Sequence, residues 1–149
     1  MKGMTMLKVL IAEDDLMIAD MTEEVLVKDG YDVCGIARTV SEAVALGRLH
    51  KPDLAVIDMR LADGGLGTQI VEQLGALETL GILYASGNAS QLDLTSEDGH
   101  ACLAKPYRSV DLLQSLKIVA GLVATGEASP PFPRGFHLLR SAVVEPLRA

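Results

Sequence analysis

Aromatic residues, cysteines and long hydrophobic runs are scarce in this chain of 149 residues. Aromatic side chains make up 3% of the sequence, tryptophan is missing, and there are two cysteines. So few cysteines exclude a small fold held together by several disulfides. The longest apolar stretch, residues 110–126, contains Asp111, Gln114 and Lys117, so it is too short and too polar to span a bilayer.

Basic residues are outnumbered, with 13 Lys and Arg against 20 Asp and Glu, and the net charge is −7. A surface of this sign disfavours nonspecific binding to nucleic acid and docking on anionic membranes. The N-terminal segment leads directly into the acidic run 13–15 and has no small-residue cleavage site, so we expect no signal peptide. A cytoplasmic protein with no nucleic-acid or membrane partner is the expectation.

Short apolar runs alternate with amphipathic segments over residues 1–124, which we assign to one domain. Uninterrupted apolar strands that alternate with helices predict a parallel sheet covered on both faces, most often in doubly wound topology. Residues 87–100 are polar and predict at most a short helix. The predicted strands are 7–12, 31–36, 53–58, 80–86 and 101–105, and the predicted helices are 16–29, 40–50, 66–77 and 109–123.

Helix boundaries are marked by capping and spacing signals. Thr39 and Glu42 match a capping box, and Ser109 is predicted to cap the last helix. Met17 and Met21, four residues apart, mark an apolar stripe on the first helix.

The composition changes after the first domain, and residues 125–149 are assigned to a C-terminal tail. Residues 125–136 carry three of the six prolines and both phenylalanines. Further along, apolar residues recur at helical spacing, which predicts a short helix that folds back on the domain or docks on a second copy or a partner. The residues of this stripe are Phe136, Leu139, Val143 and Leu147.

Polar residues stand where the predicted strands end. The first strand leads into Glu13 and Asp14, the third ends in Asp58, the fourth in Ser86 and the fifth in Lys105. Ligands of open parallel sheets bind outside the carboxyl ends of the strands, so these side chains are expected to share one rim. Clustered carboxylates favour a hard cation such as Mg²⁺, and a carboxylate can attack phosphorus. The rim therefore fits phosphoryl transfer.

The sequence resembles, over residues 7–123, the receiver domain of bacterial two-component response regulators. The resemblance rests on the acidic pair after VLIA, on Asp58 after AVI, on Ser86 in ASG, and on Lys105–Pro106. It implies a flavodoxin-like fold with five parallel strands in the order 2-1-3-4-5, and a cis Lys105–Pro106 bond. The MRLADGGLG loop and the ASGN segment are similar to the corresponding segments of single-domain receivers of the subgroup nicknamed FAT GUY.

The resemblance also implies roles for the rim residues. Asp58 would accept a phosphoryl group from a histidine kinase or phosphotransfer protein, and Ser86 and Lys105 would contact that group. Mg²⁺, or Mn²⁺ in its place, would bind Asp58, Asp14 and the backbone carbonyl of Arg60. The carboxylate of Glu13 would act through metal-bound water.

Three positions depart from the family pattern or tune it. Cys102 replaces an aromatic residue that works with Ser86 as a switch in many receivers. The residues that tune phosphate lifetime in the family are Arg60 and Asn88 here, and the long cation of Arg60 predicts slow loss of phosphate. The 19 residues between Ser86 and Lys105 (105 − 86) are few for the family, which shortens the fourth helix.

Output is expected through protein contacts, because residues 125–149 are too few for a DNA-binding domain. The expected molecule is a phosphoacceptor rather than an enzyme, with an unknown downstream protein, and a monomer or a tail-mediated homodimer. A degenerate receiver that binds proteins without phosphorylation is the alternative. An unrelated enzyme of flavodoxin-like fold is disfavoured, because no glycine-rich phosphate loop follows the first strand.

Other polar residues have simpler interpretations. Asp15 is predicted to start the first helix rather than to bind metal. Cys34 and Cys102 fall on the two outermost predicted strands, roughly 19 Å apart at about 4.8 Å per strand, so two free thiols are predicted. The histidines lack metal-ligand spacing and are predicted at the surface: His50, His100 and His137.

Overall fold

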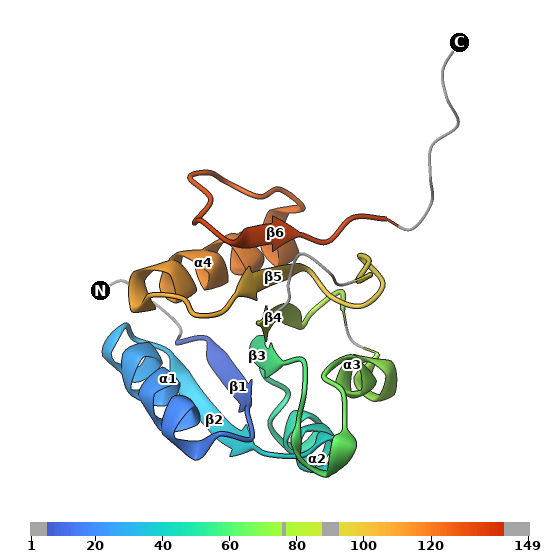
Figure 1. Cartoon of the computed structure of the whole chain (residues 1–149). Coiled ribbons are helices and arrows are strands. Elements are labelled where there is room, and N and C mark those ends of the chain that lie inside the picture. Colours follow the sequence, from blue (N-terminus) through green and yellow to red (C-terminus); the bar gives the residue numbers. More distant parts are fainter. Residues whose placement is uncertain (1–5, 76, 88–92, 142–149) are drawn as a thin grey trace.

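A computed structural model describes residues 6–75, 77–87 and 93–141 of the chain. Within them a single sheet runs in the order β2-β1-β3-β4-β5-β6 (Figure 1). The first five strands are parallel, and β6 pairs antiparallel with β5. The strands are β1 Lys8–Ala12, β2 Asp32–Ala37, β3 Leu54–Asp58, β4 Gly81–Ser86, β5 Ala101–Ala104 and β6 Phe136–Leu138.

Helices cover both faces of this sheet. Helices α1 and α4 supply residues to one apolar cluster, and α2 and α3 supply residues to the other. The flavodoxin-like fold and the strand order 2-1-3-4-5 predicted from the sequence are therefore confirmed, and β6 is an additional strand. The helices are α1 Leu16–Lys28, α2 Val40–His50, α3 Thr68–Leu74 and α4 Ser109–Thr125, with a 3₁₀ turn at Ala62–Gly64.

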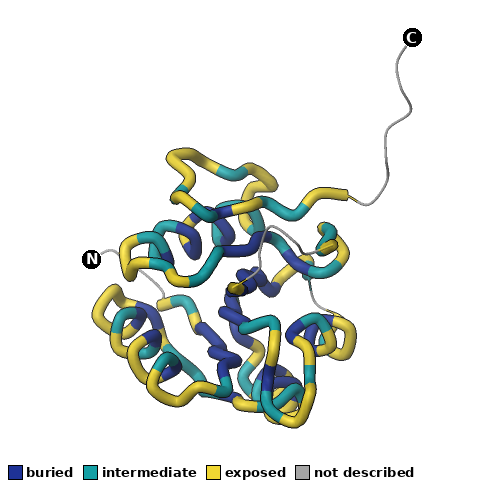
Figure 2. The backbone as a smooth tube through the Cα atoms, viewed as in Figure 1, coloured by how far each residue is buried: buried dark blue, intermediate teal, exposed yellow. Residues whose placement is uncertain are grey.

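The apolar strands are buried because successive side chains enter two different cores. In β1, Val9 and Ile11 join the cluster under α1 and α4, whereas Leu10 and Ala12 join the cluster under α2 and α3. Strands buried on both faces read as continuous apolar runs rather than alternating ones. Figure 2 shows these buried strands in the centre and the exposed turns around them.

The predicted starts of two helices are confirmed. The Oδ1 atom of Asp15 accepts hydrogen bonds from two amides of the first turn of α1, at 3.0 and 3.3 Å. Thr39 Oγ1 accepts from the amide of Glu42 at 3.1 Å, and Glu42 Oε1 accepts from the amide of Arg38 at 2.7 Å. Ser109, in contrast, is not the cap of α4. Arg108 holds that position without a side-chain cap bond.

The helix predicted from the spacing of Met17, Met21 and Val25 is confirmed, and its two methionines face solvent. Met17 is 74% exposed and Met21 61% exposed, while the helix buries Ala19, Thr22 and Leu26. The buried residues also follow helical spacing, three and four residues apart. None of the described helices is long and apolar enough to cross a membrane.

The described part of the tail forms a strand, not the predicted helix. Phe136 is buried, His137 is exposed and Leu138 is half-buried, which is the alternation of a strand at a sheet edge. The edge of β5 supplies backbone hydrogen-bond partners, whereas an isolated short helix is only marginally stable in water. Val143 and Leu147 lie outside the described residues. Residues 93–100, part of the segment predicted to hold at most a short helix, contain a turn at 96–98 and no helix.

Candidate functional site

Three carboxylates meet at the carboxyl ends of β1 and β3. These strands are neighbours, with Ala12 opposite Ile57, so the residues that follow them lie side by side. One carboxylate oxygen from each of Glu13, Asp14 and Asp58 lies within 4.8 Å of the others. We call these three residues the acidic cluster. Glu13 is only 6% exposed, and the other two are half-buried.

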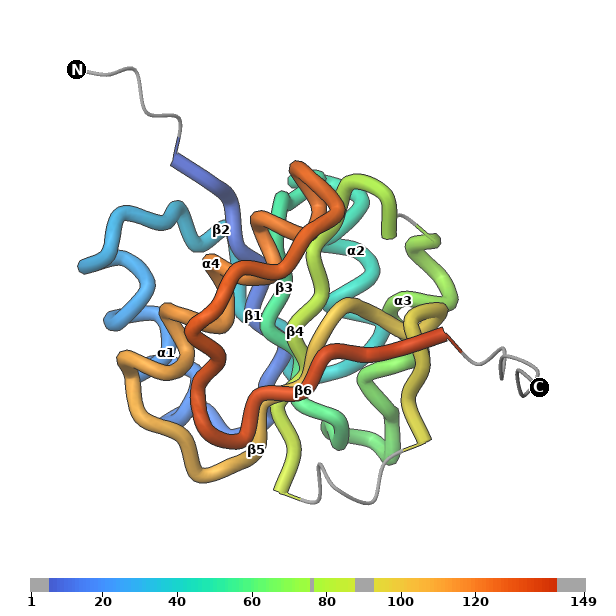
Figure 3. The backbone as a smooth tube through the Cα atoms, turned by 90° about the horizontal axis from the view of Figure 1, so that it is seen from above, coloured from blue at the N-terminus to red at the C-terminus, as the bar shows by residue number. Residues whose placement is uncertain are grey.

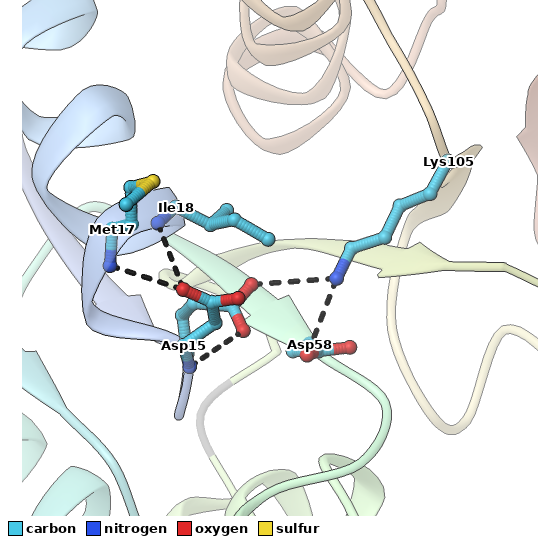
Figure 4. Close-up of polar contacts among 6 residues, drawn as sticks. Asp15, Met17, Ile18, Asp58 and Lys105 are labelled. Atoms are coloured by element: carbon cyan, nitrogen blue, oxygen red, sulfur yellow. Dashed lines mark hydrogen bonds and ion pairs between the residues drawn. The ribbon is translucent and has the colours of Figure 1, made fainter.

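The ammonium of Lys105 reaches the acidic cluster from the end of β5. Its Nζ lies 3.3 Å from Asp58 Oδ2 and 3.4 Å from Glu13 Oε1 (Figure 4). The backbone amide of Lys105 donates to the carbonyl oxygen of Ser86 at 2.9 Å, which fixes the start of the side chain. The Lys105–Pro106 bond is cis, as the sequence predicts.

Burial and mutual charge shift the pKa values of the site. The pKa of Glu13 is raised to about 7, mainly by burial and also by the neighbouring Asp58, against the opposing effects of the Asp15 amide and Lys105. Burial lowers the pKa of Lys105, but attraction to Asp58 and Glu13 outweighs it and leaves that pKa raised. Glu13 thus readily holds a proton near neutral pH, which a bound cation would displace.

Ser86 stands at the same rim, at the end of β4. Asp58 is opposite Ala85 in the β3–β4 pairing, so Ser86 lies one residue beyond the partner of Asp58. Ser86 is buried, and it pairs with Ala104 on the other side. The structure therefore brings Glu13, Asp14, Asp58, Ser86 and Lys105 to one edge of the sheet.

The remaining predicted positions are Arg60, Asn88 and Cys102. Arg60 follows β3, has an exposed side chain and forms a β-bridge with Leu66. Asn88 lies outside the described residues. Cys102 points into the core under α2 and α3, where burial raises the pKa of its thiol to about 11. Both cysteines are free, as predicted.

Two buried polar groups near β5 were missed from the sequence. Tyr84 sits opposite Cys102 in the β4–β5 pairing, fully buried, and its hydroxyl donates to the carbonyl oxygen of Asp98 at 2.6 Å. His100 is half-buried rather than at the surface, and its Nδ1 accepts from the amide of Ile82 at 3.0 Å. Neither residue stands in a motif, so only the tertiary structure shows its role.

An apolar cavity of about 430 Å³ opens beside Lys105, between α1 and the start of α4. Met21 and Val25 line it from α1, and Pro106, Tyr107 and Leu112 line it from the other side. The exposed face of α1 therefore continues into a hollow next to the acidic cluster.

The acidic cluster fits a hard divalent cation. Its members supply carboxylate oxygens only, and these oxygens are close enough to share one ion. The carboxylate of Asp58, with the ammonium of Lys105 at 3.3 Å, is also suited to attack phosphorus, because the ammonium compensates the negative charge of the incoming phosphoryl group.

The model of the response regulator receiver domain family matches residues 9–117 of the chain. The chain belongs to this family. The receiver is 31% identical over 115 residues to the transcriptional regulatory protein PdtaR of Mycobacterium tuberculosis, covering 74% of this chain and 55% of that protein. It is 25% identical over 112 residues to the chemotaxis protein CheY of Bacillus subtilis, covering 73% of this chain and 93% of that one.

Solved receiver structures share the fold. The signal receiver domain of a modulated diguanylate cyclase from Desulfovibrio desulfuricans G20 superposes with a TM-score of 0.70 at 26% identity, covering 83% of this chain and all of that one (100%). The anti-anti-sigma factor PhyR from Bartonella quintana gives a TM-score of 0.69 at 25% identity, covering 83% of this chain and 51% of that one. The receiver thus spans about half the length of PdtaR and of this PhyR.

Proposed function

We propose that Asp58 of this receiver accepts a phosphoryl group from a histidine kinase or phosphotransfer protein. The observation that carries the proposal is the position of Lys105 Nζ, 3.3 Å from Asp58 and 3.4 Å from Glu13, above carboxylates that lie within 4.8 Å of one another. The carboxylate of Asp58 thus contacts the ammonium of Lys105 and also belongs to the acidic cluster, which is suited to a cation. Membership of the receiver family supports the same assignment.

Asp14, Asp58 and the backbone carbonyl of Arg60 would hold Mg²⁺, or Mn²⁺ in its place, with Glu13 acting through a bound water. When bound, the cation neutralises negative charge on the oxygens of the transferred group. The pKa of Glu13 is raised to about 7, chiefly by burial, so this carboxyl would release its proton when a cation is held.

The transfer itself needs one nucleophile and two positioning groups. A carboxylate oxygen of Asp58 forms a new bond to phosphorus, while the bond between phosphorus and the donor's imidazole nitrogen breaks and that nitrogen keeps the electron pair. Lys105 compensates charge on the transferred oxygens, and the Ser86 hydroxyl donates a hydrogen bond to one of them. Because the product stays attached to Asp58, the protein is a phosphoacceptor rather than a turnover enzyme.

The apolar face of α1 is suited to dock the phosphodonor. Met17 and Met21 are exposed, and Met21 leads into the cavity beside Lys105. A helix of the donor that packs its apolar side there would bring a phosphohistidine next to Asp58. Flexible methionine side chains fit such an adaptable contact.

Output then passes by protein contact to a downstream protein. One feature favours the alternative of a binding module that works without phosphorylation. Cys102, at the position of the family's switch aromatic, is 2% exposed and fixed in the core. A module of that kind would bind its partner equally well with Asp58 replaced by Asn, which separates the two functions.

Intact mass after incubation with acetyl phosphate tests the proposal. We expect a gain of one phosphoryl group that requires Mg²⁺ and is lost in Asp58→Asn. Asp63→Asn is the matched control, because Asp63 lies in the 3₁₀ turn outside the acidic cluster. A gain that survives in Asp58→Asn, or one that ignores Mg²⁺, would contradict the assignment.

A further inference from the structure

The chain after α4 returns to the sheet and covers the open edge of β5. Figure 3 shows this segment running along β5 from above. We call residues 127–141 the strap. Its backbone joins the sheet at both ends of β6, because Ala104 donates to the Gly135 carbonyl at 2.9 Å and Leu139 donates to the His100 carbonyl at 3.0 Å. Beyond β6, the amide of Ser96 donates to the Arg140 carbonyl at 2.9 Å.

One aromatic side chain anchors the strap. Phe136 is 8% exposed and belongs to the apolar cluster of α1 and α4, which also contains Leu103 of β5. The centre of its ring lies 5.5 Å from that of Phe132, which is 47% exposed. Ala128 and Leu138 pack partly buried against the same cluster, and Leu139 packs against the other one. The strap thus docks through one buried ring, three smaller apolar contacts and a short ladder of backbone bonds.

The rest of the strap is loosely attached. Residues 127–135 form no helix or strand and are mostly exposed, and β6 has only three residues. This stretch is held by the packing of Ala128 and by a hydrogen bond of 3.2 Å that Gln114 Nε2 donates to the Pro131 carbonyl. Glycines at positive φ stand at both ends of this stretch, Gly126 at 82° and Gly135 at 83°. A segment with few buried contacts lies at the low-stability end of local unfolding. The strap is therefore suited to detach while the domain stays folded.

The strap is attached one residue away from the phosphoacceptor site. Ala104 bonds to the strap, and the next residue, Lys105, bonds through its amide to Ser86 and through Nζ to Asp58. Successive amides of a strand point to opposite sides, so β5 is held by the strap on one side and by the site on the other. A change in the position of Lys105 acts directly on the bond to Gly135.

We propose that the edge of β5 is a strand-docking surface filled in cis by the strap, and that strap docking and phosphorylation of Asp58 oppose one another. The inference rests on the proposed function of Asp58. A phosphoryl group brings about −1.5 to −2 charges and new acceptor oxygens, which attract Lys105 and Ser86. Lys105 follows β5 directly, and both its amide and its Nζ are bonded on the side away from the strap, so a stronger pull on Lys105 draws the end of β5 away from Gly135. Linkage makes the effect reciprocal, so a fixed strap disfavours phosphorylation.

A disulfide between the strap and β5 tests the reciprocal effect. Cys102 lies opposite His137 in the antiparallel pair, where the Cα atoms of a hydrogen-bonded pair are about 5.5 Å apart, as disulfides require. The variant is His137→Cys combined with Cys34→Ser, which removes the other thiol. His137→Ser with Cys34→Ser, treated with the same oxidant, is the control.

The oxidised variant is expected to gain a phosphoryl group from acetyl phosphate and Mg²⁺ at least about fivefold more slowly than after reduction. Equal rates in the two forms would overturn the coupling and leave the proposed function intact. A disulfide-linked dimer would overturn docking in cis and assign the strap to a second copy. If neither form nor the wild type gains a phosphoryl group, the proposed function fails, and the inference with it.

Amide hydrogen exchange of the wild type supplies a second test that needs no substitution. The amide of Leu139 donates to β5, whereas the amide of Ala43 donates within α2 to the carbonyl of Thr39. With acetyl phosphate and Mg²⁺, protection of the Leu139 amide should fall at least about fivefold, while that of Ala43 stays constant. Unchanged protection at Leu139 in protein shown by mass to be phosphorylated would overturn the inference.

Discussion

Replacement of His100 probes the junction between β4, β5 and β6. Its Nδ1 accepts from the amide of Ile82, which is fully buried, and its carbonyl accepts from Leu139. His100→Ala leaves the Ile82 amide without that acceptor, so we expect a loss of about 1–3 kcal/mol in the free energy of unfolding. His100→Asn supplies an oxygen near the same place and should restore much of this loss.

The pH dependence of stability gives the sharper test of the same residue. Burial lowers the pKa of His100, against an opposing hydrogen bond to the backbone of Leu77. Because the unfolded chain takes up the proton first, stability is complete above the unfolded pKa of about 6.5 and is lost as the pH falls from there toward the folded pKa. The slope contributed by one such group is at most about 1.4 kcal/mol per pH unit.

Urea unfolding at pH 8, 6 and 5 measures both effects, with midpoints compared at constant m-value. The wild type should lose stability relative to His100→Asn on acidification, because the asparagine does not titrate. His50 and His137 are present in both proteins and cancel in the comparison. The reasoning would be refuted if the difference in the free energy of unfolding between the two proteins did not change with pH. It would also be refuted if the wild type became the more stable of the two on going below pH 6.

Three further predictions concern the rim and its loop. Arg60→Ala should lose the phosphoryl group faster than the wild type, because a long cation no longer shields it from water; an unchanged half-life by intact mass would contradict this. Asp14→Asn should weaken Mg²⁺ binding at least tenfold by calorimetry, whereas Asp20→Asn, on exposed α1, should not; equal affinities would remove Asp14 from the metal site. Gly67→Ala should lower the free energy of unfolding by about 1–3 kcal/mol, because its Cβ would lie 2.6 Å from a main-chain oxygen at the end of β3. Gly87→Ala, with open space around it, is the control, and equal unfolding of the two variants would refute the clash.

The rim of the sheet was predictable because it depends on simple rules. Apolar runs locate the strands, parallel strands end at one edge, and the residues that follow them must meet there. Asp58 and Lys105 are 47 residues apart in sequence (105 − 58), yet the topology alone brings their strands to that edge, and the ion pair of 3.3 Å follows. Asp15 as a helix cap was predictable for a different reason, because capping depends only on the local sequence.

Features that depend on tertiary partners were not predictable. Met17 and Met21 have a helical spacing that would suit a buried stripe, but α1 buries Ala19, Thr22 and Leu26 instead, which the spacing alone does not distinguish. Phe136 and Leu139 fit helical spacing equally well, and only the open edge of β5 selects a strand. His100 lacks any motif, and its hydrogen bond to Ile82 exists because the fold brings the two together.

The identity of the phosphorylated residue tests the central claim most directly. Borohydride reduces an aspartyl phosphate to homoserine, so treatment after incubation with acetyl phosphate and Mg²⁺ marks the residue that carried the group. Sequencing of the resulting peptides by mass spectrometry should find homoserine at position 58 alone. A mark at position 14, or phosphorylated protein without a mark at position 58, would contradict the assignment of Asp58 as the phosphoacceptor.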